Sequence, residues 1–386
     1  MKETKWYCRY LVGSDPTGIT GIKSEAWSSP FLTLARGLHE ALMVEKEAWG
    51  VVLKGDAAIG GVVESGGELE QTKTVTIGGS TDGCRILCWV KDGEEGRRMK
   101  RREAMILIRR HSFEISDLIL SSFSASSDVN AVFSVTQSGK LKLTRCSIQR
   151  ESGIDMSIVS VKSFGELEMI SFKTENVEFV GKGGVIVCGD ESVVKMDGCE
   201  FSSTSFEDGA IVWGRTTNGF TILSSKFLSC IGKSFGSLIR VSVVGCVGEI
   251  KRCLFLNCRT EVRMDEKAGV GGGCVLMKMD KRTTKTRHLA RSCVDLSESV
   301  FDHCELLVKH RTEQRRCVGG SGFLVVGKER SDWVSLRDVT VSDCVCSDVE
   351  EGKGFEGGVV GWTEQPLQSD RRGMKATPKQ VGSLRL

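Results

Sequence analysis

One eight-residue pattern of apolar residues recurs along the chain and constrains its fold more than any other feature. The pattern reads apolar, any, apolar, any, any, small or apolar, any, apolar. Its copies are FEISDLIL at 113, LKLTRCSI at 141, FKTENVEF at 172, VKMDGCEF at 194, FTILSSKF at 220, GEIKRCLF at 248, VDLSESVF at 294 and VSLRDVTV at 334. Self-similarity of this kind predicts a repeat architecture, and only Gly248 departs from the apolar first position.

The spacing within each copy indicates two short strands. Apolar residues alternate within each half, as a strand with one buried face requires, but the two intervening residues break the parity between the halves. A bend at those two residues restores the inward direction. Each copy is therefore expected to turn a corner around a shared core.

A second, often glycine-led strand precedes each copy. These strands are AMILI at 104, AVFSV at 131, SIVSV at 157, GGVIVC at 183, GAIVW at 209, SLIRVSV at 237, GGCVLM at 272 and GFLVVG at 322. Copies start 22 to 31 residues apart before insertions near the C-terminus. Three strands per repeat predict an all-β, single-stranded, right-handed parallel β-helix. A final GGVVGW at 357 begins a coil that lacks its eight-residue partner.

Leucine-rich repeats are the main competing fold because their strand segment follows a similar pattern. Their leucine three residues before each copy is absent, since residues such as Arg110, Ser138 and Glu191 stand there. A glycine-led strand also occupies the place of their helix. Propellers need longer repeats of about 40 residues or more, built from antiparallel hairpins.

The ends of the chain are expected to differ from the repeat. Ser29 and Pro30 form a helix start, and the following apolar residues share one helical face, which predicts a capping α-helix. We therefore divide the chain into an N-terminal strand and capping helix (1–48), the β-helix (49–362) and a polar, disordered tail (363–386). The alternative for the tail is that the chain is a fragment whose next coils are missing.

Composition excludes several classes of protein. With 53 basic and 50 acidic residues, the net charge of +3 gives no global attraction to nucleic acid. No run of 18 apolar residues predicts a membrane span, and Met1 to Tyr10 alternate charge with aromatic residues instead of forming an apolar signal segment.

The N-terminal region resembles a known family. The order of strand, GSD-type loop, PFLTL and amphipathic helix at 10–42, followed by GVVLKGD at 50 and VTIGG at 75, resembles the cap and first coils of pectin-lyase-like right-handed β-helix proteins. Glycine-led strands paired with FLSC at 227, FLNC at 255 and FDHC at 301 are similar to repeats of polymorphic outer-membrane adhesins. The resemblance covers residues 7–362 and implies a surface or secreted protein, whereas the missing signal segment favours the cytoplasm or an incomplete N-terminus.

The resemblance to pectin-lyase-like proteins raises the possibility of a polysaccharide lyase or hydrolase. Such enzymes need clustered carboxylates, which bind calcium or act as acid and base. Asp197, Asp295 and Asp338 lie at different positions of the repeat, and no polygalacturonase motif is present. We therefore predict no catalytic residues, no cofactor and no enzyme activity.

Cysteines recur at two positions of the repeat. Cys146, Cys199 and Cys253 share the sixth position with Ser225 and Ser299. A second set, Cys230, Cys258, Cys304 and Cys344, follows three residues after a copy ends. Coils about 4.8 Å apart would align the second set as a stacked ladder, or as the disulfides Cys230–Cys258 and Cys304–Cys344. The alternative is that these cysteines serve as small buried apolar side chains.

Metal and polyanion sites have weaker support. Cys293, His303, Cys304, His310 and Cys317 lie near one another in sequence, but no paired CxxC spacing indicates zinc, and we predict no metal site. Three basic stretches begin at Arg97, Lys278 and Lys309, between the repeat elements. The candidate polyanion-contact loop contains Lys281, Arg282, Lys285 and Arg287.

Three functional hypotheses follow. The first is a noncatalytic, adhesin-like scaffold that binds glycans or protein partners along its lateral face, with a polysaccharide or a cell-surface protein as partner. The second is a carbohydrate-active enzyme whose carboxylates converge from different coils. The third is a purely structural protein without a ligand.

Overall fold

The structure of the chain is a computed structural model. It describes residues 104–264 with gaps at 125–128, 217 and 234–236, and then residues 270–279, 292–310, 317–327, 333–348 and 355–364. Shorter described stretches lie between residues 4 and 89, among them 48–53, 72–79 and 83–89.

Three long sheets run along the molecule, and in all of them the paired strands are parallel except for β1 with β2. Sheet A is built from the following strands: β2 (Val12–Ser14), β1 (Thr4–Tyr7), β3 (Ala48–Leu53), β6 (Thr74–Gly79), β9 (Ser112–Ser116), β12 (Lys140–Thr144), β15 (Glu166–Ile170), β18 (Val193–Asp197), β21 (Gly219–Leu223), β25 (Val247–Lys251), β30 (Cys293–Ser297) and β34 (Trp333–Arg337). Neighbours in this order are hydrogen-bonded to each other.

Sheet B follows the second half of each eight-residue copy. Its main path consists of β4 (Ala57–Ala58), β7 (Arg85–Trp89), β10 (Ile119–Ser124), β13 (Ser147–Gln149), β16 (Lys173–Phe179), β19 (Glu200–Phe206), β22 (Lys226–Leu228), β26 (Leu254–Leu256), β31 (Val300–Asp302) and β35 (Thr340–Ser342). A branch contains β23 (Ile231–Gly232), β27 (Arg259–Met264), β32 (Glu305–His310) and β36 (Val345–Asp348).

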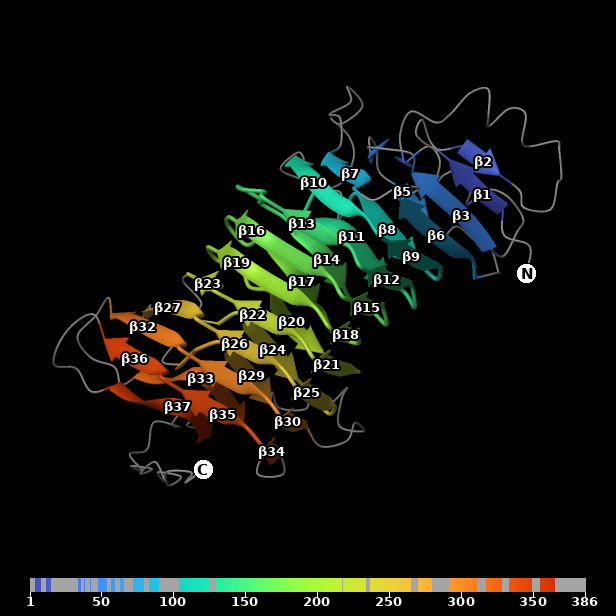
Figure 1. The fold of residues 1–386 in the computed structure, drawn as a ribbon. Helices are drawn as coiled ribbons and strands as arrows, with labels where there is room; N and C mark the ends of the chain where they lie inside the picture. Colours follow the sequence, from blue (N-terminus) through green and yellow to red (C-terminus); the bar gives the residue numbers. More distant parts are fainter. Residues whose placement is uncertain are drawn as a thin grey trace.

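Sheet C is formed by the predicted second element. It consists of β5 (Val63–Ser65), β8 (Ile106–Arg109), β11 (Ala131–Thr136), β14 (Ser157–Val161), β17 (Gly184–Cys188), β20 (Val212–Thr216), β24 (Ile239–Val243), β29 (Val275–Met279), β33 (Cys317–Gly327), β28 (Val270–Gly272) and β37 (Phe355–Glu364). The chain passes from sheet A to B to C and then into the next coil (Figure 1). The predicted parallel β-helix is confirmed.

The copy expected at residue 172 was placed in the wrong register. Strand β15 pairs with β12 so that Leu167 lies opposite Leu141, and it pairs with β18 so that Met169 lies opposite Met196. The true copy is therefore LEMISFKT at 167–174, whose last apolar position holds a threonine. Thr174 is buried there, and its hydroxyl shares a 2.7 Å hydrogen bond with that of Thr204. With this register, successive copies from Phe113 to Gly248 begin 26 to 28 residues apart.

A single residue makes the predicted bend between sheets A and B. The fifth residue of every copy has a positive φ, between 48° and 60°. These residues are Asp117, Arg145, Ser171, Gly198, Ser224, Arg252, Glu298 and Asp338. One residue in the left-handed region reverses the facing of the chain, so that the sixth residue points inward again. The parity break in the sequence is thus one left-handed residue per coil.

The core is a column of stacked side chains inside the three sheets. Phe201, Phe227, Phe255 and Phe301 occupy the same place in four successive coils and are fully buried. Their rings stack at centroid distances of 5.3, 4.5 and 4.6 Å with interplanar angles of 7° or less. Parallel in-register pairing therefore places like residues on like residues.

Both predicted chain ends fall mostly outside the described residues. Of the capping helix, Leu34, Ala35, Leu38 and Leu42 are described as helical, and the three leucines belong to the core. Strand β37 reaches Glu364, and residues 365–386 of the predicted tail lie outside the description. Among the described residues, no helix has the length and apolar character that a membrane crossing requires.

Candidate functional site

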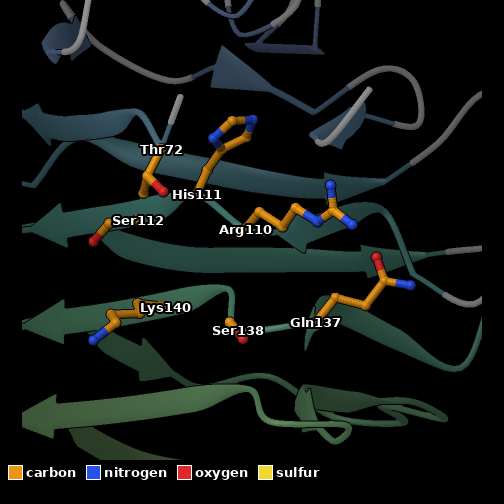
Figure 2. A pocket seen from close by; sticks show the side chains of 7 residues that line it. All are labelled: Thr72, Arg110, His111, Ser112, Gln137, Ser138 and Lys140. Carbon is orange, nitrogen blue, oxygen red and sulfur yellow. The ribbon is translucent and has the colours of Figure 1, made fainter. Parts of the chain in front are cut away.

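A polar recess of about 460 Å³ lies where the chain passes from sheet C to sheet A. Two consecutive coils form most of it, one through the corner between β8 and β9 and the other through the corner between β11 and β12, and the coil before them contributes Thr72, just before β6. Its lining consists of Thr72, Arg110, His111, Ser112, Gln137, Ser138 and Lys140. Figure 2 shows Arg110 and Gln137 at one end of the recess and Ser112 and Lys140 at the other.

Backbone hydrogen bonds join the two corners and fix the positions of their main-chain atoms relative to each other. The amide of Arg110 donates to the carbonyl of Gln137 at 3.2 Å, and the amide of Lys140 donates to the carbonyl of His111 at 2.8 Å. A Cβ at Gly139 would lie 2.5 Å from the Ile108 carbonyl oxygen, so this corner requires glycine. The scaffold of the recess is therefore rigid main chain.

The recess carries two cationic side chains on its rim. Arg110 and Lys140 are exposed, and the Lys140 ammonium forms a 2.9 Å ion pair with Glu166 of the next coil. His111 lies beneath them with 3% exposure, and its Nδ1 accepts a hydrogen bond of 3.1 Å from the Lys73 amide. Burial, followed by the charge of Lys73, lowers the pKa of His111. The His111 side chain is thus neutral at pH 7. The positive charge of the recess comes from Arg110 and from Lys140, which is paired with Glu166.

The lining side chains can offer positive charge and hydrogen bonds to a ligand. Guanidinium, ammonium, amide and hydroxyl groups donate or accept hydrogen bonds to hydroxyls and carboxylates. The residues that line the recess include no carboxylate, and glycoside hydrolysis uses a pair of them. The arrangement therefore supports binding of an anionic, hydroxyl-rich ligand.

The two predicted cysteine columns are present in the structure. The sixth-position residues Cys146, Cys199 and Cys253 are buried at the corner between sheets A and B, in the column that also holds Ser225 and Ser299. The four residues of the second set stack at the corner that follows the main strands of sheet B: Cys230, Cys258, Cys304 and Cys344. All of them are free thiols.

The thiols of the second column bond to main-chain carbonyls of the preceding coil. Cys230 donates to Phe201 at 3.3 Å, Cys258 to Phe227 at 3.2 Å, and Cys304 to Phe255 at 3.6 Å. Cysteine thus acts here as a small buried side chain with a weak donor. The stacked ladder is seen, and the disulfides Cys230–Cys258 and Cys304–Cys344 are not formed in this structure.

The three aspartates considered for catalysis do not converge. Asp197 and Asp295 lie on the outer face of sheet A in different columns, and Asp338 is the left-handed corner residue of its coil. Asp295 forms an ion pair of 2.9 Å with Arg337. These carboxylates are separate surface groups.

Several predicted sites fall outside the described residues. The candidate polyanion-contact loop with Lys281, Arg282, Lys285 and Arg287 is one of them, and so are the stretch at 97–102 and residues 311–316. Of the cysteine and histidine group near residue 300, Cys293 and Cys304 are buried whereas His303 is exposed, so the described members do not share one site.

The residues of the recess were missed by the sequence analysis. Arg110 and Ser138 were noted only because a leucine-rich repeat would have leucine at these positions. The available signal was their shared distance of three residues before consecutive copies, which brings them to the same corner of adjacent coils. The polar residues at such corners do not recur from copy to copy, so a search for repeated residues does not detect them.

Comparisons with known proteins place the chain in no family. No family model matches it, and no curated protein matches it. Among solved structures, the chain is similar to the Siphovirus 9NA tailspike receptor binding domain, with 9% identity, a TM-score of 0.25, and coverage of 90% of this chain and 77% of that chain.

Proposed function

We propose that this protein is a noncatalytic, pectin-lyase-like β-helix scaffold whose lateral face binds an acidic polysaccharide in an adhesin-like role. The recess between Arg110 and Lys140 carries the proposal. It places two cations and several hydroxyl and amide groups on rigid main chain at consecutive coils.

A polymeric ligand fits this recess better than a small one. The recess is open to solvent, whereas sites for small molecules enclose most of their ligand. Lys140 stacks on Ser112 and Arg110 on Gln137, so the two charges lie diagonally across adjacent coils, and a polymer that crosses the recess obliquely would meet both. Further contacts along the same polymer would then add affinity through effective concentration.

The first prediction concerns the charge of the recess. We expect Arg110→Gln with Lys140→Gln to weaken binding of polygalacturonate at least about tenfold, because each charge-assisted hydrogen bond contributes roughly 1.5–3 kcal/mol. Binding is measured by titration calorimetry or by retention on an immobilised polymer. Methyl-esterified polygalacturonate, which lacks the carboxylates, should bind weakly to both proteins.

The matched control is Lys142→Gln. Lys142 lies on the same strand as Lys140 and forms a comparable ion pair, at 3.0 Å with Glu168, but it does not line the recess. Its substitution should leave binding unchanged. Equal losses in the control and the double variant would show that only general surface charge is involved. Unchanged binding in the double variant would refute the recess as the site.

The noncatalytic part of the proposal has its own test. Wild-type protein is incubated with pectate, alginate and related polymers, with and without calcium. We expect no release of unsaturated or reducing ends. Release of either would replace the scaffold proposal with the alternative of a carbohydrate-active enzyme.

A further inference from the structure

Two carboxylates and an imidazole converge on the outer surface where sheet B ends in the last two coils. Asp302 closes β31, His303 follows it, and Asp343 follows β35 in the next coil. Each of the three offers a ligand atom, and these atoms lie within 4.8 Å of one another. In the described part of the chain, no other group of three such side chains meets this distance.

Coil stacking holds the three groups together. The amide of His303 donates to the carbonyl of Ser342 at 3.0 Å, which joins the two turns. His303 and Asp343 are both left-handed, with φ of 51° and 47°, and occupy equivalent places in their coils. The Ser342 hydroxyl donates to Asp302 Oδ1 at 2.6 Å and fixes that carboxylate.

The hydrogen bonds determine which imidazole nitrogen is available. Asp302 Oδ1, to which the Ser342 hydroxyl donates, acts as an acceptor, as a carboxylate oxygen does. The His303 Nδ1, which lies 2.8 Å from Asp302 Oδ1, must therefore carry the proton. The other ring nitrogen, Nε2, lies 3.8 Å from Asp343 Oδ2. When the ring holds a single proton, on Nδ1, the Nε2 lone pair and the Asp343 carboxylate offer two metal ligands on the same side.

We propose that His303 and Asp343 bind a borderline divalent cation such as Zn²⁺ or Co²⁺, and that Asp302 orients the imidazole. Tetrahedral ligands about 2.0–2.1 Å from zinc lie roughly 3.3 Å apart, close to the observed 3.8 Å. A carboxylate bonded to the other ring nitrogen of a ligating histidine is the common outer partner in such sites. Water would complete the coordination, because all three side chains are partly or largely exposed.

Such an ion would act as a clip between coils. Its ligands come from two coils that are joined at this corner by backbone hydrogen bonds, core packing and the hydrogen bond from Ser342 to Asp302. An ion that binds the folded state alone stabilises it through mass action. The cation site is independent of the acidic-polysaccharide proposal, since it involves other residues and another sheet.

The experiment is a titration of the folded, reduced protein with cobalt(II) chloride. We expect one equivalent to bind with weak visible absorption, because nitrogen and oxygen ligands produce no intense thiolate-to-metal band. His303→Asn should abolish this binding, and Asp302→Asn should weaken it about 10- to 100-fold, as for other outer partners. Asparagine tolerates the left-handed backbone of residue 303 and has nearly the same shape as Asp302, so both variants are expected to fold. Circular dichroism checks the fold.

Asp338→Asn is the matched control, because Asp338 is also a left-handed, exposed aspartate of the last coil but lies at the other corner. It should bind cobalt like the wild type. Binding that survives in His303→Asn would overturn the proposal, as would an intense near-ultraviolet thiolate band. Absence of one-equivalent binding in the wild type would overturn it equally.

Discussion

Left-handed residues at the corner between sheets A and B determine the local geometry of every coil. Seven of the eight are not glycine, although an L-residue in this conformation costs roughly 1–2 kcal/mol. Stacked backbone hydrogen bonds hold them there, for example from the Ser224 amide to the Lys251 carbonyl at 2.9 Å. The corner thus retains strain that substitutions can increase or relieve.

Gly198 and Ser224 occupy this corner in neighbouring coils and permit a test of opposite sign. Gly198→Ala should lower the free energy of unfolding by about 1 kcal/mol, because the alanine is strained at φ +60° while its Cβ meets only Ser171 Oγ, at 3.6 Å. Ser224→Gly should raise the free energy by about 0.5–1 kcal/mol. Urea unfolding measures both. Changes of the same sign would contradict strain as the cause.

Buried cysteines make the stability of the fold sensitive to alkali. Burial raises the pKa of Cys199 from its ordinary value of 9.0 to about 11. The unfolded thiol ionises above pH 9 while the folded thiol stays neutral, so stability that is complete below pH 9 declines between pH 9 and 11. For one such group the loss approaches about 2 kcal/mol at pH 10.5.

Cys199→Ser tests this relation with a residue that the same column already contains at Ser225. We expect the fall in the free energy of unfolding between pH 8 and pH 10.5 to be smaller in the variant than in the wild type. The difference should be about 2 kcal/mol. Parallel pH profiles for the two proteins would show that the pKa of the Cys199 thiol is the same in the folded and unfolded states.

At the scale of the element, the outer face of sheet A carries charges that alternate from coil to coil. One column reads Glu114, Lys142, Glu168 and Lys195 in four consecutive coils. Lys142 and Glu168 lie 3.0 Å apart, and both side chains are substantially exposed. Each such pair contributes little by itself, but a shift by one coil would place like charges opposite each other. The charges in this column therefore favour the observed order of neighbouring coils over an arrangement in which one coil is skipped.

Glu168→Lys should place three lysines in succession in this column. We expect the free energy of unfolding to fall by about 0.5–1 kcal/mol at low ionic strength, and by less in 1 M salt, because exposed charges are screened. Adding Lys195→Glu should restore part of the loss, because it places a carboxylate beside the new lysine and leaves Glu114 opposite Lys142. Urea titrations at two salt concentrations measure this, and a loss that is independent of salt would indicate disturbed packing instead of repulsion.

For the whole molecule, the fold was predictable because its core repeats. Apolar residues that recur every coil, such as Phe227 and Phe255, reveal the strands and their stacking directly. The register error at 172 arose because Thr174 satisfies its buried hydroxyl with Thr204 and so breaks the apolar pattern. Coil order was thus visible in sequence, while a polar pair inside the core was not.

The candidate sites were far less predictable, since they depend on which side of the chain each residue faces. His303 and Cys304 are adjacent in sequence, yet the first faces solvent and the second faces the core. A search for metal ligands by sequence spacing therefore combined residues that cannot meet. The recess near Arg110 depends equally on two coils that lie side by side, which single-sequence patterns do not report.

The left-handed corner also separates what can change in this chain from what cannot. Each eight-residue copy crosses that corner with the same length, even though the copies at Gly248, Val294 and Val334 are separated by insertions elsewhere in the coil. The constant length of chain across this corner thus keeps the cross-section of the solenoid the same from coil to coil. Descendants of this sequence can gain or lose loops at the other corners and diversify their exterior without redesigning the interior.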